Sequence, residues 1–222
     1  MTSDTIGNEA PGVAAAAEPS AARVRLPRHL WHAARRRIAW LSTTRANARA
    51  GLVADVLAAC ALLAAGLTRG DNRPGTSLAS VLLGLLVFSF VEYCFHRWLF
   101  HGRVELLEQG HSKHHEQPLA DDSLPFFAPP LAAFALAWLL AAILPTTTAL
   151  LFTGGMAAGY AAYGLTHSVF HHVRFRRLFA RRWAAAHHIH HFHPDSNFGV
   201  TSPLWDIVLR TRYRPAPPRS AQ

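Results

Sequence analysis

Four groups of histidines at helical spacing constrain this chain more than any other feature of its sequence. Thirteen of its fifteen histidines lie between residues 96 and 193. Histidines three or four residues apart lie on one face of a helix, so a group can direct several imidazoles to the same side. The first pair is five residues apart, which predicts a helix end or a bend between its members. The ten histidines of the four groups are His96, His101, His111, His114, His115, His167, His171, His187, His190 and His191.

Clustered imidazoles are typical of a metal site, and ten are too many for one ion, because even an octahedral metal accepts six donors. The pattern therefore predicts two metals with five histidine ligands each. Each metal would have fewer ligands if some imidazoles support the ligating ones instead of binding metal. Imidazole binds iron, zinc and copper alike, so the donors leave the metal open. His172, His188 and His193 break the spacing, and we expect them behind the ligands or facing solvent.

Four apolar runs indicate a membrane protein. Half of the 222 residues are hydrophobic, and each run approaches the length that a bilayer core requires. We expect an all-α, polytopic membrane protein with about four transmembrane helices and a cytoplasmic, histidine-rich helical cap that holds a di-metal site. The runs cover residues 50–67, 77–95, 126–144 and 149–165.

The placement of basic residues predicts the orientation. The formal net charge is +9, but the arginines flank the apolar runs, which favours a membrane over nucleic acid as partner. Of the 22 basic residues, only Arg69 and Arg73 fall in an outer loop. The positive-inside rule therefore places both termini and every histidine group in the cytoplasm. The two cysteines, Cys60 and Cys94, provide neither a disulfide framework nor a cysteine zinc site.

The same patterns divide the chain into five segments. The first is rich in alanine and lacks the apolar core of a signal peptide, so we expect it to be disordered. The second mixes arginines with aromatic residues, as in helices that lie on an anionic lipid surface. The segments are a tail at 1–27, a basic interfacial segment at 28–49, a first transmembrane hairpin at 50–87, a histidine-box domain at 88–213 and a C-terminal tail at 214–222.

Residues 88–213 resemble the fatty acid hydroxylase superfamily, which includes sterol desaturases, fatty acid 2-hydroxylases and β-carotene hydroxylases. The resemblance rests on the four boxes HRWLFH, HSKHH, HSVFH and HHIHH and on the tail NFGVTSPLWD at 197–206, which looks most like fatty acid 2-hydroxylases. It implies an oxygen-dependent di-iron oxidoreductase that hydroxylates or desaturates a lipid such as a fatty acyl chain or a sterol. The ten box histidines would hold two irons, and a separate ferredoxin or cytochrome b5 would supply electrons.

Several residues outside the boxes are candidates for positions behind the ligands or beside the substrate. Glu92 lies four residues before His96 on the same helical face, and Tyr163, Asn197 and Trp205 are further candidates. We expect Gly199 to supply backbone freedom in the turn after the last box.

Two other functions stay open from the sequence. One is a β-carotene-type carotenoid hydroxylase, and the other is a membrane zinc hydrolase. Zinc could also fill the site of a purified oxygenase, because it binds imidazole more tightly than ferrous iron does. A transporter would place its polar ligands near the middle of the bilayer, whereas these histidines gather at one end of the apolar runs.

Overall fold

The computed structural model of this chain describes residues 28–71, 73–102, 105–121 and 123–215. These residues form helices joined by loops and contain no strand. The predicted tail at 1–27 and most of the predicted tail at 214–222 lie outside the described residues. The elements are α1 (Arg28–Ser42), α2 (Arg45–Leu67), α3 (Pro74–Cys94), η1 (Phe95–Phe100), α4 (Glu105–Glu116), α5 (Ala128–Ala141), α6 (Thr146–His172), α7 (Leu178–Phe192) and α8 (Leu204–Val208).

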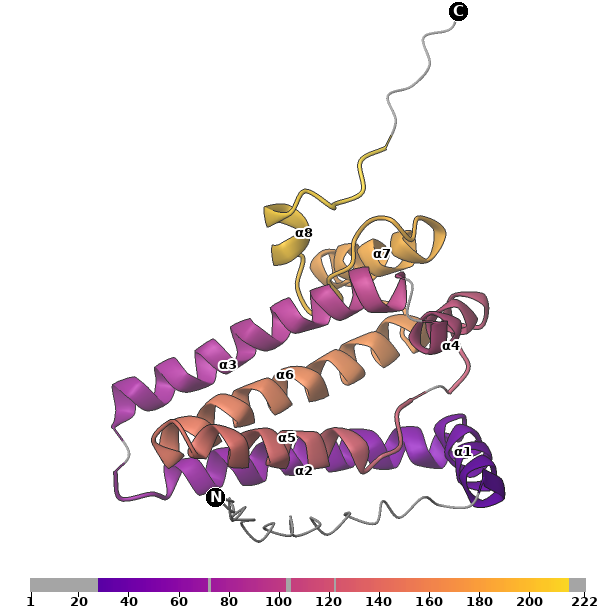
Figure 1. Ribbon diagram of the computed structural model, residues 1–222. Coiled ribbons are helices and arrows are strands. Elements are labelled where there is room, and N and C mark those ends of the chain that lie inside the picture. Colours follow the sequence, from indigo (N-terminus) through magenta and orange to yellow (C-terminus); the bar gives the residue numbers. More distant parts are fainter. Residues whose placement is uncertain (1–27, 72, 103–104, 122, 216–222) are drawn as a thin grey trace, which may run out of the picture.

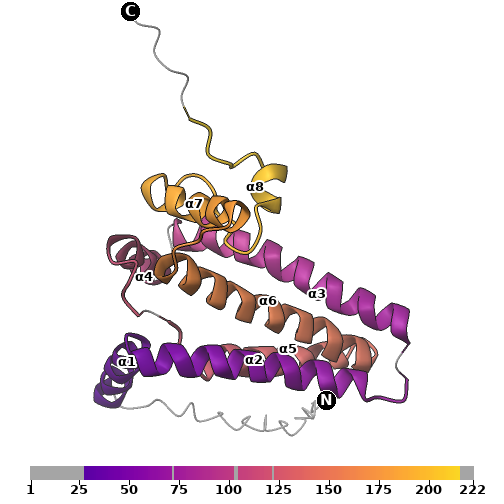
Figure 2. The same ribbon diagram turned by 180° about the vertical axis from the view of Figure 1, so that it is seen from behind.

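The helices form a bundle with a cap at one end. Helices α2, α3, α5 and α6 run alongside one another, and α6 packs against each of the other three (Figure 1). Helices α4 and α7 gather near the end of the bundle where α3 and α6 finish, and Figure 2 shows the same arrangement from behind. The histidine groups therefore meet at one end of the bundle, as the sequence predicts.

Two of the bundle helices are long and apolar enough to cross a membrane, Arg45–Leu67 and Pro74–Phe100. Helix α5 is apolar but has only 14 residues, or about 21 Å of helix, which is less than the ~30 Å of a hydrocarbon core. Helix α6 has 27 residues, but glycine, threonine and alanine dilute its apolar character. All four predicted runs form helices of one bundle, two of them are candidate spans by length and composition, and four transmembrane spans stay a prediction.

Small residues let α3 and α6 approach until their backbones touch. A Cβ at Gly84 would lie 2.1 Å from the Phe152 carbonyl oxygen, and a Cβ at Gly155 would lie 2.4 Å from the Val81 carbonyl oxygen. Such close approach through small residues is typical of helix pairs in membranes. The close approach explains why α6 is rich in small residues, because a larger side chain at the contact would separate the two helices.

The loop between α4 and α5 is fastened to α2 by a buried amide. Asn47 donates from Nδ2 to Ser123 Oγ at 2.8 Å and to the Leu124 carbonyl oxygen at 2.9 Å, and its Oδ1 accepts from the Phe126 amide at 2.9 Å. Both N–H donors and the oxygen of the amide group are therefore paired. This contact fixes the loop that follows the second histidine group, so α4 is held against the bundle.

Helix α1 and the start of α2 make up the predicted interfacial segment. Arg36 and Arg37 are exposed, and Trp40 is 70% exposed beside them. This arrangement is compatible with the expected position at a lipid surface.

Replacing Gly155 with alanine should force α3 and α6 apart. The new Cβ meets a backbone oxygen, which cannot swing away, so we expect a loss of about 1–3 kcal/mol in stability. Melting of the detergent-purified protein measures it. Gly164→Ala is the matched control on the same helix, because its Cβ would meet no atom within 4 Å. Equal melting temperatures for the two variants would contradict the close packing.

Candidate metal centre

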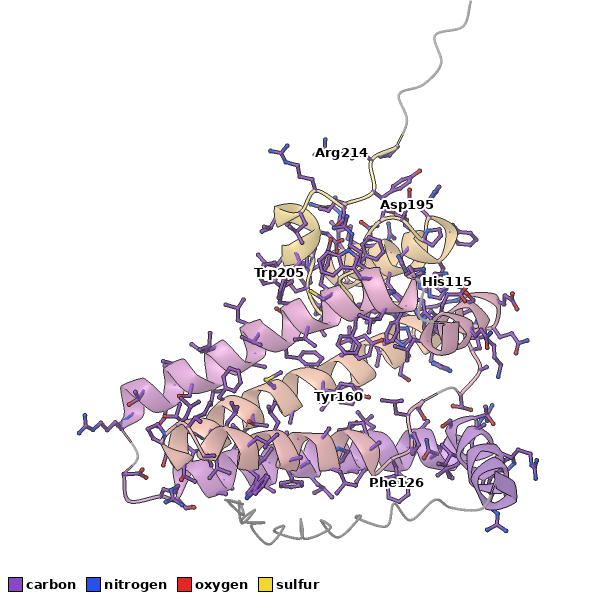
Figure 3. The ribbon with its side chains drawn as sticks, in the orientation of Figure 1. His115, Phe126, Tyr160, Asp195, Trp205 and Arg214 are labelled. Carbon is purple, nitrogen blue, oxygen red and sulfur yellow. The ribbon has the colours of Figure 1, made fainter. Side chains whose placement is uncertain are left out.

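The ten box histidines converge into two clusters of five, at the end of the bundle where α4 and α7 pack (Figure 3). Within each cluster, one ring nitrogen of every histidine lies within 4.8 Å of those of the other four. Helices α4 and α7 contribute to both clusters. Cluster A contains His96, His101, His111, His115 and His190, and cluster B contains His114, His167, His171, His187 and His191.

A π-helical turn brings the first pair together. The predicted helix end between His96 and His101 is confirmed, because η1 ends at Phe100 and His101 caps it, with the His101 amide donating to the His96 carbonyl oxygen at 3.3 Å. Hydrogen bonds between residues five apart widen the turn, so positions i and i+5 lie near the same face. The two imidazoles are stacked, with ring centroids 5.3 Å apart. The spacing of five is therefore matched to this turn.

Cluster A cannot be explained as a network of hydrogen bonds. The Nε2 atom of His111 lies 3.1 Å from that of His96, 3.0 Å from that of His101 and 3.1 Å from that of His115. A neutral imidazole nitrogen has one proton or one lone pair, so it cannot pair with three others. A cation among these nitrogens would use every lone pair, and the donor set fits a metal ion.

Cluster B has the same character. The Nε2 atom of His187 lies 2.9 Å from that of His171 and 3.2 Å from that of His191. The Nε2 atom of His114 is buried with no hydrogen-bond partner among the described residues. Five nitrogens that share a small volume again fit a metal ion.

The spacing of the nitrogens favours a high coordination number. With metal–nitrogen bonds of about 2.1 Å, donors at right angles lie ~3.0 Å apart and tetrahedral donors lie ~3.4 Å apart. The shortest nitrogen–nitrogen distances in the two clusters are 2.9–3.2 Å, and the remaining pairs of each cluster lie within 4.8 Å. The shortest distances match five or six donors rather than the four of an ordinary zinc site.

Burial keeps the cluster imidazoles neutral. Desolvation, reinforced by neighbouring imidazoles, lowers the pKa of His101 to about 4 and that of His114 to about 4. Desolvation likewise lowers the pKa of His190 to about 3, although its hydrogen bond to the Ser196 carbonyl opposes the shift. With these lowered pKa values the rings are uncharged at neutral pH, and the neutral ring is the form that binds metal.

Backbone carbonyls orient two imidazoles of cluster A. His96 donates from Nδ1 to the Phe198 carbonyl oxygen at 2.5 Å, and His190 donates from Nδ1 to that of Ser196 at 2.7 Å. Because a carbonyl can only accept, the proton is on Nδ1 and the lone pair of Nε2 faces the cluster. The sequence reasoning missed this role, since backbone groups leave no signal in the residue types.

Glu92 lies behind cluster A rather than in it. Its carboxylate is buried and accepts hydrogen bonds from the Val200 amide at 2.7 Å, the Thr201 amide at 2.9 Å and the Thr201 hydroxyl. Asp206, which the sequence analysis did not single out, accepts from the Phe198 amide at 2.9 Å and the Gly199 amide at 2.8 Å. The two carboxylates thus hold the loop that orients the imidazoles.

The turn after the last box depends on Asn197 and Gly199, and Gly199 acts differently from what the sequence suggested. Asn197 is buried and has a φ of 55°, and its side chain bonds the Ala186 carbonyl and the Tyr213 amide. No described glycine has a positive φ, so the predicted conformational role of Gly199 is wrong. Glycine is required there because a Cβ would lie 2.1 Å from the Ser202 carbonyl oxygen.

The other candidates lie around the clusters. The Tyr163 ring is parallel to that of His167 with centroids 5.7 Å apart, and Trp205 donates to Ser89 Oγ at 3.0 Å. Their contact with substrate stays a prediction. The three histidines that break the spacing, His172, His188 and His193, are exposed and outside both clusters.

Comparison with known proteins gives the family. The fatty acid hydroxylase profile matches residues 81–211. The chain is 35% identical over 154 residues to the dihydroceramide fatty acyl 2-hydroxylase FAH1 of Arabidopsis thaliana. The matched region covers 64% of this chain and 64% of that protein. The chain is also 35% identical to the fatty acid 2-hydroxylase of Mus musculus, over 59% of this chain and 38% of that protein. The chain thus spans less than two thirds of these relatives.

A solved structure supports the same relationship. The structure described as full length scs7p, with only the hydroxylase domain visible, has a TM-score of 0.68 and 25% identity. The match covers 82% of this chain and 71% of that one. With a family profile that spans more than half of its length, including all ten clustered histidines, this chain belongs to the fatty acid hydroxylase family.

Proposed function

We propose that this protein is a membrane-bound, oxygen-dependent di-iron enzyme that hydroxylates the acyl chain of a lipid. The observation that carries the proposal is the convergence of ten histidines into two clusters at the end of an apolar helical bundle. Relatives named as hydroxylases of fatty acids and dihydroceramide point to carbon 2 of a fatty acid or of an amide-linked acyl chain as the site of reaction.

The donor set supports two redox metals. Ten neutral imidazoles leave two divalent ions with their full charge. The clusters are adjacent, since the His115 ring of cluster A stacks on the His191 ring of cluster B with centroids 4.4 Å apart. Two bound irons would supply the activation of dioxygen that an unactivated C–H bond requires. A zinc hydrolase would need a four-coordinate site with an open position, which the nitrogen spacing does not favour.

The surroundings support a lipid substrate. The bundle exposes large apolar side chains along both candidate spans, including Leu57 and Leu78, and such a surface is suited to contact with lipid acyl chains. We propose four spans, with both termini and the clusters on the cytoplasmic side, as the distribution of arginines indicates. A separate ferredoxin or cytochrome b5 would deliver the electrons. By their names, the relatives above act on fatty acyl chains, so we favour an acyl chain over a carotenoid ring or a sterol.

The metal content tests the centre directly. Protein loaded with iron and purified without oxygen should contain two irons per chain. We expect His96→Ala to remove the iron of cluster A and His187→Ala that of cluster B, because each residue is a buried member of one cluster. His172→Ala, which alters an exposed neighbour of the clusters, should retain both irons. Retention of two irons by both cluster variants would overturn the ligand set.

Isotope labels test the reaction. With ¹⁸O₂, a reductant and an acyl lipid, one oxygen atom should enter the product and the other should leave as water, with two electrons and two protons consumed. A substrate that carries two deuterium atoms at carbon 2 should lose one of them. His114→Ala should form no product while staying in the membrane, because it removes a ligand and no span. Product without ¹⁸O, or with both deuterium atoms retained, would refute 2-hydroxylation.

A further inference from the structure

The two clusters differ in what stands behind their imidazoles. In cluster A, His96 and His190 each donate from Nδ1 to a backbone carbonyl. In cluster B, the Nδ1 atoms of His187 and His191 are buried without a hydrogen-bond partner in the described part of the chain. Cluster A is therefore oriented by hydrogen bonds, whereas these two rings of cluster B are held by packing alone.

The two carbonyls that orient imidazoles of cluster A belong to the loop at 196–201. Two buried carboxylates, one from α3 and one from α8, hold this loop in place. Glu92 reaches from α3 and accepts hydrogen bonds from the Val200 and Thr201 amides. Asp206 reaches from α8 and is only 2% exposed. Its Oδ1 accepts from the Phe198 amide at 2.9 Å and from Thr211 Oγ1 at 2.7 Å, and its Oδ2 accepts from the Gly199 amide at 2.8 Å. Every donor in this arrangement is an amide or a hydroxyl, so the loop cannot shift without leaving a buried carboxylate unpaired.

This support changes how strongly a metal is held. A hydrogen bond from the far nitrogen of an imidazole fixes its tautomer and ring orientation and makes the ligating nitrogen more basic. Loss of such a partner typically weakens metal binding by about 10–100-fold. Two of the five imidazoles of cluster A have this support, while cluster B has an unsupported pair.

We infer that Glu92 and Asp206 are positioning residues that make the two metal sites unequal, so that cluster A holds its metal more strongly than cluster B. The inference rests on the proposed di-metal centre. Metal then leaves cluster B first, and the Asp206 carboxylate controls the release from cluster A through the loop at 196–201. Glu92 and Asp206 touch no metal themselves, because the loop lies between them and the clusters.

Metal release in the absence of oxygen tests the inequality. Iron-loaded protein is mixed with an excess of a ferrous chelator, and the coloured complex is followed over time. The wild type should release its two irons in two phases of equal amplitude. His187→Ala, which retains the metal of cluster A, should show only the slow phase, and His96→Ala should show only the fast one. A single phase in the wild type, or equal rates in the two variants, would overturn the inference.

A substitution at Asp206 tests the positioning role. In Asp206→Asn an NH₂ group replaces one carboxylate oxygen and faces an amide or hydroxyl donor, so the loop loses a hydrogen bond. We expect the slow phase to become about 10–100-fold faster and the fast phase to stay unchanged. Asp195→Asn is the matched control, because Asp195 is exposed and lies on the same connection between α7 and α8 (Figure 3).

The phases separate this inference from the rest of the proposal. If Asp206→Asn accelerates both phases alike, the residue merely loosens the fold and its positioning role is wrong. If that variant does not fold, the two single-cluster variants still decide whether the sites are unequal. A wild-type chain that loads two irons and releases them together contradicts only the inequality. A chain that cannot load two irons contradicts the di-metal centre as well.

Discussion

The structure depends on one electrostatic constraint: ten neutral imidazoles must direct their lone pairs into two small volumes. Lone pairs of nitrogens about 3 Å apart repel unless a cation lies among them. In cluster A, three nitrogens surround the Nε2 atom of His111 at 3.0–3.1 Å, which no arrangement of protons on neutral rings can satisfy. Folding and the proposed metal binding would therefore be coupled, because cations would share the lone pairs that the folded cap brings together.

The rest of the chain meets this constraint by bringing rigid elements together at one end. Backbone contact at Gly84 and Gly155 sets the approach of α3 and α6. The π-helical turn η1 then rotates His96 and His101 onto one face, and Asn47 fastens the loop that follows α4. Each device lies some distance from the metals, yet each one positions a helix that carries ligands. The loop at 196–201 completes the cap by joining α3, α7 and α8 through Glu92 and Asp206.

The position of the centre also accounts for the proposed chemistry. The clusters lie at one end of an apolar bundle, where the proposed acyl substrate would come from the lipid around the candidate spans. Since every histidine of the clusters is neutral, no carboxylate would offset the charge of the proposed metals, and the two buried acids of the cap accept hydrogen bonds from backbone amides instead. The fatty acid hydroxylase profile matches residues 81–211, the region that contains all ten clustered histidines.

The sequence by itself determined the helical class, the apolar runs and the ten histidines, because residues three or four apart share a helical face wherever the helix lies. It also indicated the family through the four boxes. The tertiary structure alone decided how the ten divide, since His111 and His114 are neighbours on α4 yet belong to different clusters. Backbone atoms decide three further features: the π-helical turn, the carbonyls behind His96 and His190, and the role of Asp206. The carbonyl behind His96 belongs to Phe198, which is more than 100 residues away in the sequence. Residue types at helical spacing do not predict backbone contacts of this kind, and the bond between His96 and Phe198 exists only after α3 has packed against the loop between α7 and α8.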